Sequence, residues 1–323
     1  MKKYIFFLLI LQLFYGCSVN GDSDPVNLDI EIESNEDKNS QITQSIPPND
    51  VAEMKSLFES FDGISTSSDS NYFYISSNGL PSHNMMVGIT NWQQQFPIDQ
   101  NYTSNNSWSI PINPEFSDKP LSSEENFMKG ALAIAVNGIP IFNPLNNRGE
   151  DASAIGELDQ WGGHCGKADD YHYHLPPIHL SDVVGNNSPI AYSLDGFPVY
   201  GKTDKLLDEN LGILNEDGSY HYYAVDDYPY FIANMKGKVT TSGIAPENQI
   251  DPQSVTSAIR PALNPLKDAV ITNFTKIDSN SYQLKYEINS EIFIIDYYWD
   301  SSGHYYITFT NPDGTKQIET YHR

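Results

Sequence analysis

Apolar residues are spaced unevenly along the chain, and their spacing changes character twice. They are dense in residues 5–13, sparse in the acidic, Ser/Asn-rich residues 18–50, and frequent again from there on. Residues 51–61 have apolar positions at helical spacing, and Asn49 or Asp50 is the predicted N-cap of a short helix. Most of the remaining chain is predicted to form short β-strands separated by turn residues.

Several short strands are predicted in the middle of the chain. They cover residues 71–76, 108–112, 131–136 and 190–194. Asn137-Gly138 follows the third of these strands and suggests a hairpin with a two-residue primed turn, and Asp195-Gly196 is a second hairpin signal. We therefore expect an antiparallel sheet or a sandwich-like domain in this region.

Five further strands are predicted near the C-terminus. They cover residues 269–277, 282–288, 292–299, 305–310 and 316–321, and turn residues separate them at short intervals. Such close spacing is typical of an antiparallel β-meander. The predicted fold class is therefore mainly β with a minor helical part.

The same patterns predict five segments. These are a signal peptide (1–16), a lipidated, disordered and acidic stalk (17–48), a main domain (49–240), a linker or crossing loop rich in Pro, Ser, Gly and Asn (241–267), and the meander (268–323). The stalk is too polar to bury enough apolar surface to fold alone.

The N-terminal segment has the features of an export signal. Lys2 and Lys3 precede an apolar core that is shorter than the roughly 20 residues needed to span a bilayer. Gly16-Cys17 after this core is typical of a bacterial lipoprotein processing site, at which Cys17 is lipidated. An ordinary secretory signal with an incidental cysteine is the alternative, and both interpretations export the protein. We expect membrane attachment only through lipid at Cys17, in the bacterial cell envelope, with the outer membrane favoured.

The chain is strongly acidic, and this limits its partners. Its formal net charge is −24 and its pI is near 4.4. Binding to phosphate groups needs clustered Lys and Arg, so nucleic acid is not an expected partner. Cations are the natural counter-charge, although an acidic coat also keeps a surface protein soluble without any binding site.

The densest group of metal-capable side chains lies between Leu158 and Pro177. It contains His164, Cys165, His172 and His174. In an extended segment successive side chains point to opposite faces, so the two imidazoles of the His-Tyr-His sequence are predicted to share one face and the flanking tyrosines the other.

This arrangement makes a metal site our first hypothesis. A third ligand from His164 or His83 would complete a site suited to zinc or copper. Cys165 is either a further ligand, which would favour Cu(I), or a buried and inert thiol. Asp170 and Asp195 are candidate partners that orient an imidazole. The alternative is that the histidines are hydrogen-bonded structural residues of a tyrosine-rich sheet.

The segment Ser219–Tyr223 repeats the pattern of Asp170–His174 at a distance of 49 residues. This repeat is compatible with two similar strands lying side by side in one sheet. Tyr223 takes the place of the second histidine, so the second copy is predicted to be the poorer ligand site.

The sequence blocks around these histidines resemble the YHYH domain family. The blocks are Ala135–Pro144, Gly163-His164, Tyr171–His174 and Tyr192–Gly201, and the resemblance extends over residues 65–240. Members of the family are mostly exported bacterial proteins with a poorly defined biochemical role. The resemblance therefore implies a domain more firmly than an activity.

Two functions remain open on this basis. The first is a cell-envelope lipoprotein whose YHYH domain binds copper or zinc through a histidine cluster. The second is a surface module that binds a glycan or a protein and in which the YHYH motif is structural, because many of the 21 tyrosines lie beside polar residues and can stack on sugar rings. Tyrosine also suits half-buried strands. No HExxH, GxSxG or P-loop motif indicates a particular reaction.

Overall fold

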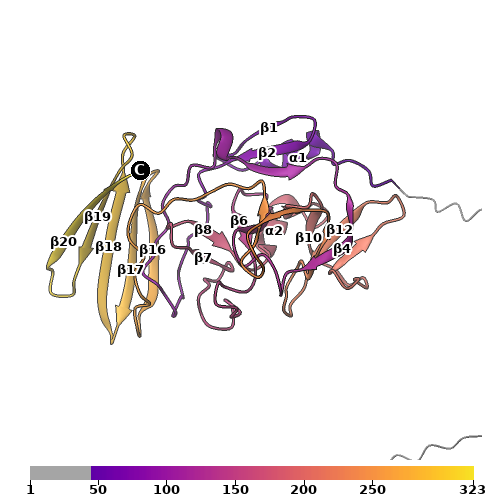
Figure 1. Cartoon of the computed structure of the whole chain (residues 1–323). Helices are drawn as coiled ribbons and strands as arrows, with labels where there is room; N and C mark the ends of the chain where they lie inside the picture. The colour runs from indigo at the N-terminus through magenta and orange to yellow at the C-terminus, as the bar shows by residue number, and fades with distance from the viewer. Residues whose placement is uncertain (1–44) are drawn as a thin grey trace, which may run out of the picture. The chain divides into compact units, whose positions relative to one another are not determined.

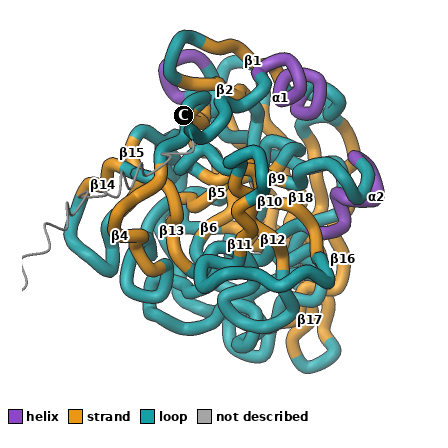
Figure 2. The backbone as a smooth tube through the Cα atoms, turned by 90° about the vertical axis from the view of Figure 1, so that its right-hand side faces the viewer, coloured by secondary structure: helices purple, strands orange, loops and turns teal. Residues whose placement is uncertain are grey.

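The computed structural model describes residues 45–323, and these belong to one compact unit (Figure 1). The predicted signal peptide, the predicted lipidation site at Cys17 and nearly all of the predicted stalk lie outside the described residues. Within residues 45–323 no helix is long and apolar enough to cross a membrane. The described chain is mainly β, as predicted, and loops make up much of it around the short central strands (Figure 2).

The predicted N-terminal helix is confirmed as α1 (Val51–Phe58). Asp50 is its N-cap, since the carboxylate accepts hydrogen bonds from the backbone N–H groups of Ala52 and Glu53 at 2.9 and 3.1 Å. The buried ring of Phe58 packs on Phe73 at 5.8 Å between ring centroids. The other helical elements are the short turns η1 (Ser104–Asn106), η2 (Ile178–Leu180) and α2 (Ser181–Val184).

The described residues also form three small sheets of two or three strands. The first is antiparallel, in the order β1 (Ser65–Ser68), β2 (Tyr72–Ser76) and β3 (Trp108–Pro111). The other two pair β4 (Phe116–Ser122) with β13 (Asn234–Gly237), and β14 (Thr240–Ser242) with β15 (Gln249–Asp251). Alternating burial along β2 places Phe73 and Ile75 in the core, which is the period expected of a half-buried strand.

The central sheet has eight short strands. They are β5 (Ala131–Ala135), β6 (Pro140–Phe142), β7 (Gly163–Cys165), β8 (Tyr171–Tyr173), β9 (Ala191–Ser193), β10 (Pro198–Lys202), β11 (Gly212–Leu214) and β12 (Tyr220–Ala224). Their order is β11-β12-β10-β9-β5-β6-β8-β7. The pairs β6/β8 and β10/β12 are parallel, so the sheet is mixed and not antiparallel throughout. Strands β8 and β12, which contain the repeated sequence pattern, belong to one sheet. They are not neighbours, because β6, β5, β9 and β10 lie between them.

Both predicted hairpins, β5-β6 and β9-β10, are present. The prediction of a primed turn in the first is wrong. Positive φ occurs at Gly138 (+76°) but not at Asn137, and the Gly138 N–H donates to the Ala135 carbonyl at 2.8 Å. This is the longer hairpin loop in which a glycine occupies the left-handed position of a bulge. An added Cβ at Gly138 would also lie 2.8 Å from Cβ of Ser77.

The C-terminal meander is confirmed. Its strands are β16 (Val270–Asp278), β17 (Ser281–Ile288), β18 (Glu291–Trp299), β19 (His304–Thr310) and β20 (Lys316–His322), each antiparallel to the next. The Tyr297 hydroxyl donates to the Pro97 carbonyl at 2.7 Å, and the Tyr305 hydroxyl donates to the Asp99 carboxylate at 2.8 Å. These bonds attach the meander to residues that precede β3.

Candidate metal centre

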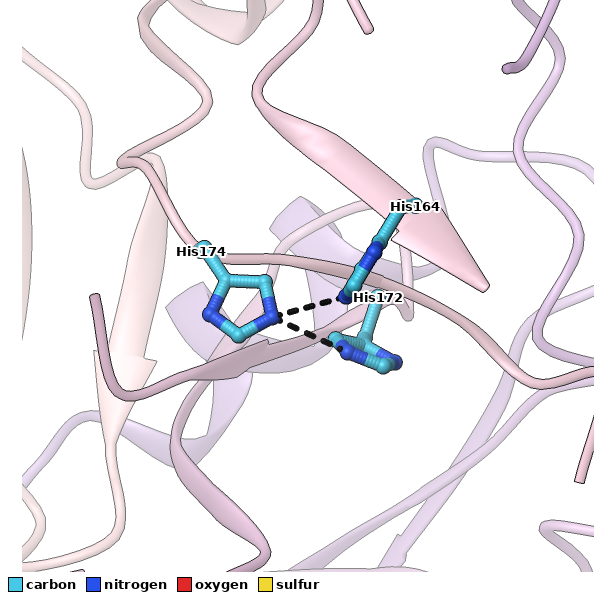
Figure 3. Close-up of side chains that lie close together, drawn as sticks. All are labelled: His164, His172 and His174. Atoms are coloured by element: carbon cyan, nitrogen blue, oxygen red, sulfur yellow. Dashed lines mark hydrogen bonds between the residues drawn. The ribbon is translucent and has the colours of Figure 1, made fainter. Parts of the chain in front are cut away.

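Strands β7 and β8 place the histidines on one face of the sheet. The antiparallel register pairs His164 with His172 and Cys165 with Tyr171. Directly paired residues share a face, and neighbours along a strand alternate, so the histidines and the tyrosines of the motif lie on opposite faces, as predicted. His174 follows the end of β8, and the three imidazoles converge (Figure 3).

The tyrosine face of β8 is structural. The Tyr171 hydroxyl donates to the Asp159 carboxylate at 2.8 Å, and the Tyr173 hydroxyl accepts a hydrogen bond from the Asn137 side-chain amide at 3.0 Å. Both rings are fully buried. An added Cβ at Gly163 would lie 2.5 Å from the Tyr171 hydroxyl, so the neighbouring strand needs glycine here.

A buried ion pair fixes the turn between β7 and β8. Asp169, at a positive φ of 56°, accepts hydrogen bonds from Nε and Nη2 of Arg260, both at 2.7 Å. The guanidinium also lies 4.2 Å from the ring centroid of Phe96. Arg260 belongs to residues 241–267, the segment that the sequence predicts as a linker or crossing loop. No local sequence pattern links this arginine to a turn 91 residues away, so the sequence does not predict the contact.

The nitrogen atoms of the three histidines form a tight group. The Nε2 atom of His174 lies 3.0 Å from Nε2 of His164 and 3.2 Å from Nε2 of His172 (Figure 3). All candidate ligand atoms of the group lie within 4.8 Å of one another. His172 and His174 are only 3 and 4 % exposed, and His164 is partly buried. The cluster is therefore of a kind that can hold a metal ion.

Backbone carbonyls determine which nitrogen of two rings carries the proton. Nδ1 of His172 lies 2.9 Å from the Asp170 carbonyl oxygen, and Nδ1 of His174 lies 2.5 Å from that of Asn143. A carbonyl oxygen only accepts, so Nδ1 donates in both rings. In a neutral ring Nε2 then carries a lone pair. The short Nε2···Nε2 contact of His172 and His174 therefore joins two lone pairs, which repel each other unless a proton or a metal ion lies between them.

Burial disfavours the proton. It lowers the pKa of His174 to about 3, and the neighbouring His172 adds to the shift. Burial also places the pKa of His164 well below its usual value, with further contributions from His174, His172 and Arg148. Neutral imidazole is the form that binds metals. Two nitrogens at about 2.0–2.1 Å from a tetrahedral zinc ion are about 3.3 Å apart, close to the 3.0 and 3.2 Å that separate Nε2 of His174 from the other two rings. The ligand atoms of His164 and His172 lie within 4.8 Å of each other.

Aromatic and acidic neighbours hold His172 in place. The Phe142 ring stacks on His172 with 4.0 Å between centroids. The Asp170 carboxylate lies 3.4 Å from Nδ1 of His172, so this predicted orienting residue contacts the cluster. Asp195 does not contact it. It lies in the β9-β10 turn, where its carboxylate accepts hydrogen bonds from the Tyr222 hydroxyl and the Gly237 N–H, both at 2.7 Å.

Two of the five predicted metal ligands lie outside the group. Nε2 of His83 lies 2.7 Å from the Tyr173 hydroxyl, on the tyrosine side of β8, and its ring stacks on Trp161. Cys165 shares the face of Tyr171, and burial raises the pKa of its thiol well above the usual value. The structure thus brings together His164, His172 and His174, and the donor set of the group is three imidazoles.

Comparison with known proteins identifies the family of this region. Residues 107–216 match the family model described as YHYH protein. The chain contains a YHYH family domain. The matched residues include all three histidines of the cluster, and they lie within the range over which the sequence blocks resemble the family. No curated protein and no solved structure gives a significant match to the chain.

In the YHYH domain the cluster opens on a cavity of about 470 Å³, which the three imidazoles, Phe142, Trp108 and Glu157 help to line. The Glu157 carboxylate is buried and accepts hydrogen bonds from Arg148 at 2.5 Å and from the Asn146 side chain at 3.1 Å. The indole N–H of Trp108 is buried without a partner among the described residues. Neither Arg148 nor Trp108 stands in a recognisable motif, so the sequence does not predict their place at this cavity.

Proposed function

We propose that the YHYH domain binds a transition metal, zinc or copper, through the Nε2 atoms of His164, His172 and His174. One observation carries this proposal. Backbone carbonyls hold the Nδ1 protons of His172 and His174, so their Nε2 lone pairs converge in a buried site where protonation is disfavoured. Imidazole donors suit both zinc and copper. The Cys165 thiol, which would favour Cu(I), is not part of the ligand group.

The cavity supports a site with an open coordination position. Structural zinc sites are closed by four protein ligands, whereas sites with three protein ligands keep a position for water or another molecule. A cavity of about 470 Å³ beside the imidazoles has room for a small molecule. We therefore propose that the bound metal takes a small exogenous ligand from this side.

We further propose that the protein is exported and attached to the cell envelope by lipid at Cys17, with the outer membrane favoured. The N-terminal sequence supports this proposal. Incorporation of a labelled fatty acid that is lost in Cys17→Ser tests it. Binding of a glycan or a protein stays a prediction from the sequence, and the buried motif tyrosines Tyr171, Tyr173, Tyr220 and Tyr222 do not form a stacking surface for it.

Metal analysis of the purified, unlipidated chain tests the metal proposal. After loading with zinc or copper and removal of excess metal, we expect about one ion per wild-type chain and almost none in His172→Ala/His174→Ala. His304→Ala/His322→Ala is the matched control, because it removes two neighbouring histidines (4.7 Å between ring centroids) from the meander. This control should keep the ion. Negligible metal in the loaded wild-type chain, or equal metal in the wild type and the first variant, would refute the site.

A further inference from the structure

The central sheet is symmetric in its strand order. Read outward from the central pair, one half is β5-β6-β8-β7 and the other is β9-β10-β12-β11. Each half begins with an antiparallel hairpin, continues with a parallel neighbour and ends with an antiparallel strand. The two halves meet at the antiparallel pair β5/β9. Topology therefore relates the halves by an approximate twofold rotation.

The two hairpins have corresponding turn hydrogen bonds and corresponding glycines. In the first, the Gly138 N–H donates to Ala135 at 2.8 Å, and in the second the Gly196 N–H donates to Ser193 at 2.9 Å. Both glycines have positive φ, +76° and +97°. Gly196 follows Gly138 by 58 residues, and Pro140 and Pro198 are related by the same interval.

The backbone hydrogen bonds where β5 and β9 meet are reciprocal as well. The Val136 N–H donates to the Ile190 carbonyl at 2.9 Å, and the Leu194 N–H donates to the Leu132 carbonyl at 2.8 Å. Each donor and each acceptor is related to its counterpart by the same interval of 58 residues. A chance resemblance of two hairpins would not also produce this reciprocal pair of hydrogen bonds between them.

The outer strands match through an aspartate and a tyrosine. Asp159 accepts from the N–H of Gly163 at 3.1 Å and from the hydroxyl of Tyr171 at 2.8 Å. In the other half, 49 residues later, the Asp208 carboxylate accepts from the Gly212 N–H and the Tyr220 hydroxyl, both at 2.9 Å. An added Cβ would clash with the tyrosine hydroxyl at both glycines.

We infer that the sheet consists of two copies of one four-strand unit, and that the second copy holds a counterpart of the histidine site that lacks two of its three ligands. His172 corresponds to His221, while His164 and His174 correspond to Ile213 and Tyr223. The metal-binding part of this inference rests on the proposed function above.

The second site keeps the strand pairing and the ring stacking of the first. Ile213 is paired with His221 across β11/β12, as His164 is paired with His172 across β7/β8. The ring of Tyr200 stacks on His221 at 4.8 Å between centroids, in the place that Phe142 takes on His172.

The backbone at the third ligand position also matches. The Tyr223 N–H donates to the Leu211 carbonyl at 2.9 Å, and the His174 N–H donates to the Gly162 carbonyl at 2.8 Å. Leu211 and Gly162 both have positive φ. Two substitutions, Ile213→His and Tyr223→His, should therefore create a second three-imidazole site.

The test is metal stoichiometry of the unlipidated chain carrying Ile213→His/Tyr223→His. We expect about two zinc ions per chain, against one in the wild type, and a return to one when His221→Ala is added. In the His172→Ala/His174→Ala background the same two substitutions should raise the content from none to one. This background distinguishes the inferred second copy from the proposed metal site, because any metal bound there depends on the second copy alone.

Folded variant protein that binds no more zinc than its parent in either background would overturn the inference. A wild-type chain that binds none, with one ion gained by the variant, would refute the proposed function and support the duplication. Should the double variant fail to fold, Tyr223→His alone is a milder change, since Tyr223 is only partly buried. It should add a Cu²⁺ signal with two coordinating nitrogens in electron paramagnetic resonance, and its absence would overturn the inference.

Discussion

Replacing Arg260 with methionine tests what holds the β7-β8 turn. The guanidinium and the Asp169 carboxylate are 6 and 1 % exposed, and two bonds of 2.7 Å join them. Arg260→Met keeps much of the side-chain volume but leaves a buried carboxylate without its partner. Removing one member of a buried pair costs about 3–5 kcal/mol. At about 2–4 °C per kcal/mol for a domain of this size, the melting temperature should fall by about 6–20 °C.

Two further variants test whether the loss of stability comes from the burial of the pair and from the unpaired charge. Lys238 and Glu115 form an ion pair of similar length, 2.6 Å, with side chains 59 and 68 % exposed, so Lys238→Met should leave the melting temperature unchanged. Asp169→Asn/Arg260→Met removes both charges and should be more stable than Arg260→Met alone. Calorimetry measures the melting temperatures of all three variants. Zinc titration should show weaker binding in Arg260→Met, in which the turn is disturbed, but not in Lys238→Met. A loss of less than about 1 kcal/mol in Arg260→Met would refute the role assigned to this pair.

Two more predictions concern the histidines. Asp170→Asn should weaken zinc binding by less than about 10-fold, because the His172 Nδ1–H donates to the Asp170 backbone carbonyl, which the substitution keeps, while the carboxylate lies 3.4 Å away; competition with a chelator measures it, and a loss of about 100-fold would show that the carboxylate and not the carbonyl orients the ring. Burial, together with the neighbouring His83, lowers the pKa of His179 to about 4. Between pH 6.5 and 4 this ring is therefore protonated only in the unfolded chain. Its contribution to the free energy of unfolding falls as the pH falls through this range. Urea unfolding of metal-free protein should therefore depend less steeply on pH in His179→Gln than in the wild type over this range, and equal slopes would count against it.

Local patterns predicted the elements whose residues interact with near neighbours. The meander strands follow from alternating burial and short turns, and helix α1 follows from Asp50 and the apolar spacing behind it. The common face of His172 and His174 follows from strand geometry alone.

Long-range contacts do not follow from local sequence patterns. The carbonyl of Asn143 lies 31 residues from His174, and Arg260 lies 91 residues from Asp169, and no local period encodes either contact. Asp195 is near the histidines in sequence, but it belongs to the other half of the sheet. The parallel pairs β6/β8 and β10/β12 join segments separated by loops, which is why a purely antiparallel sheet was expected.

The main-chain acceptors of the two buried imidazoles have a consequence for mutagenesis. The oxygens that bind Nδ1 of His172 and His174 belong to the peptide groups of Asp170 and Asn143, and these groups persist whatever side chains replace them. An alanine scan will therefore under-report the residues that orient the ligands. Changes that displace the backbone, such as a one-residue insertion between Phe142 and Asn143, will reveal what side-chain deletion leaves intact.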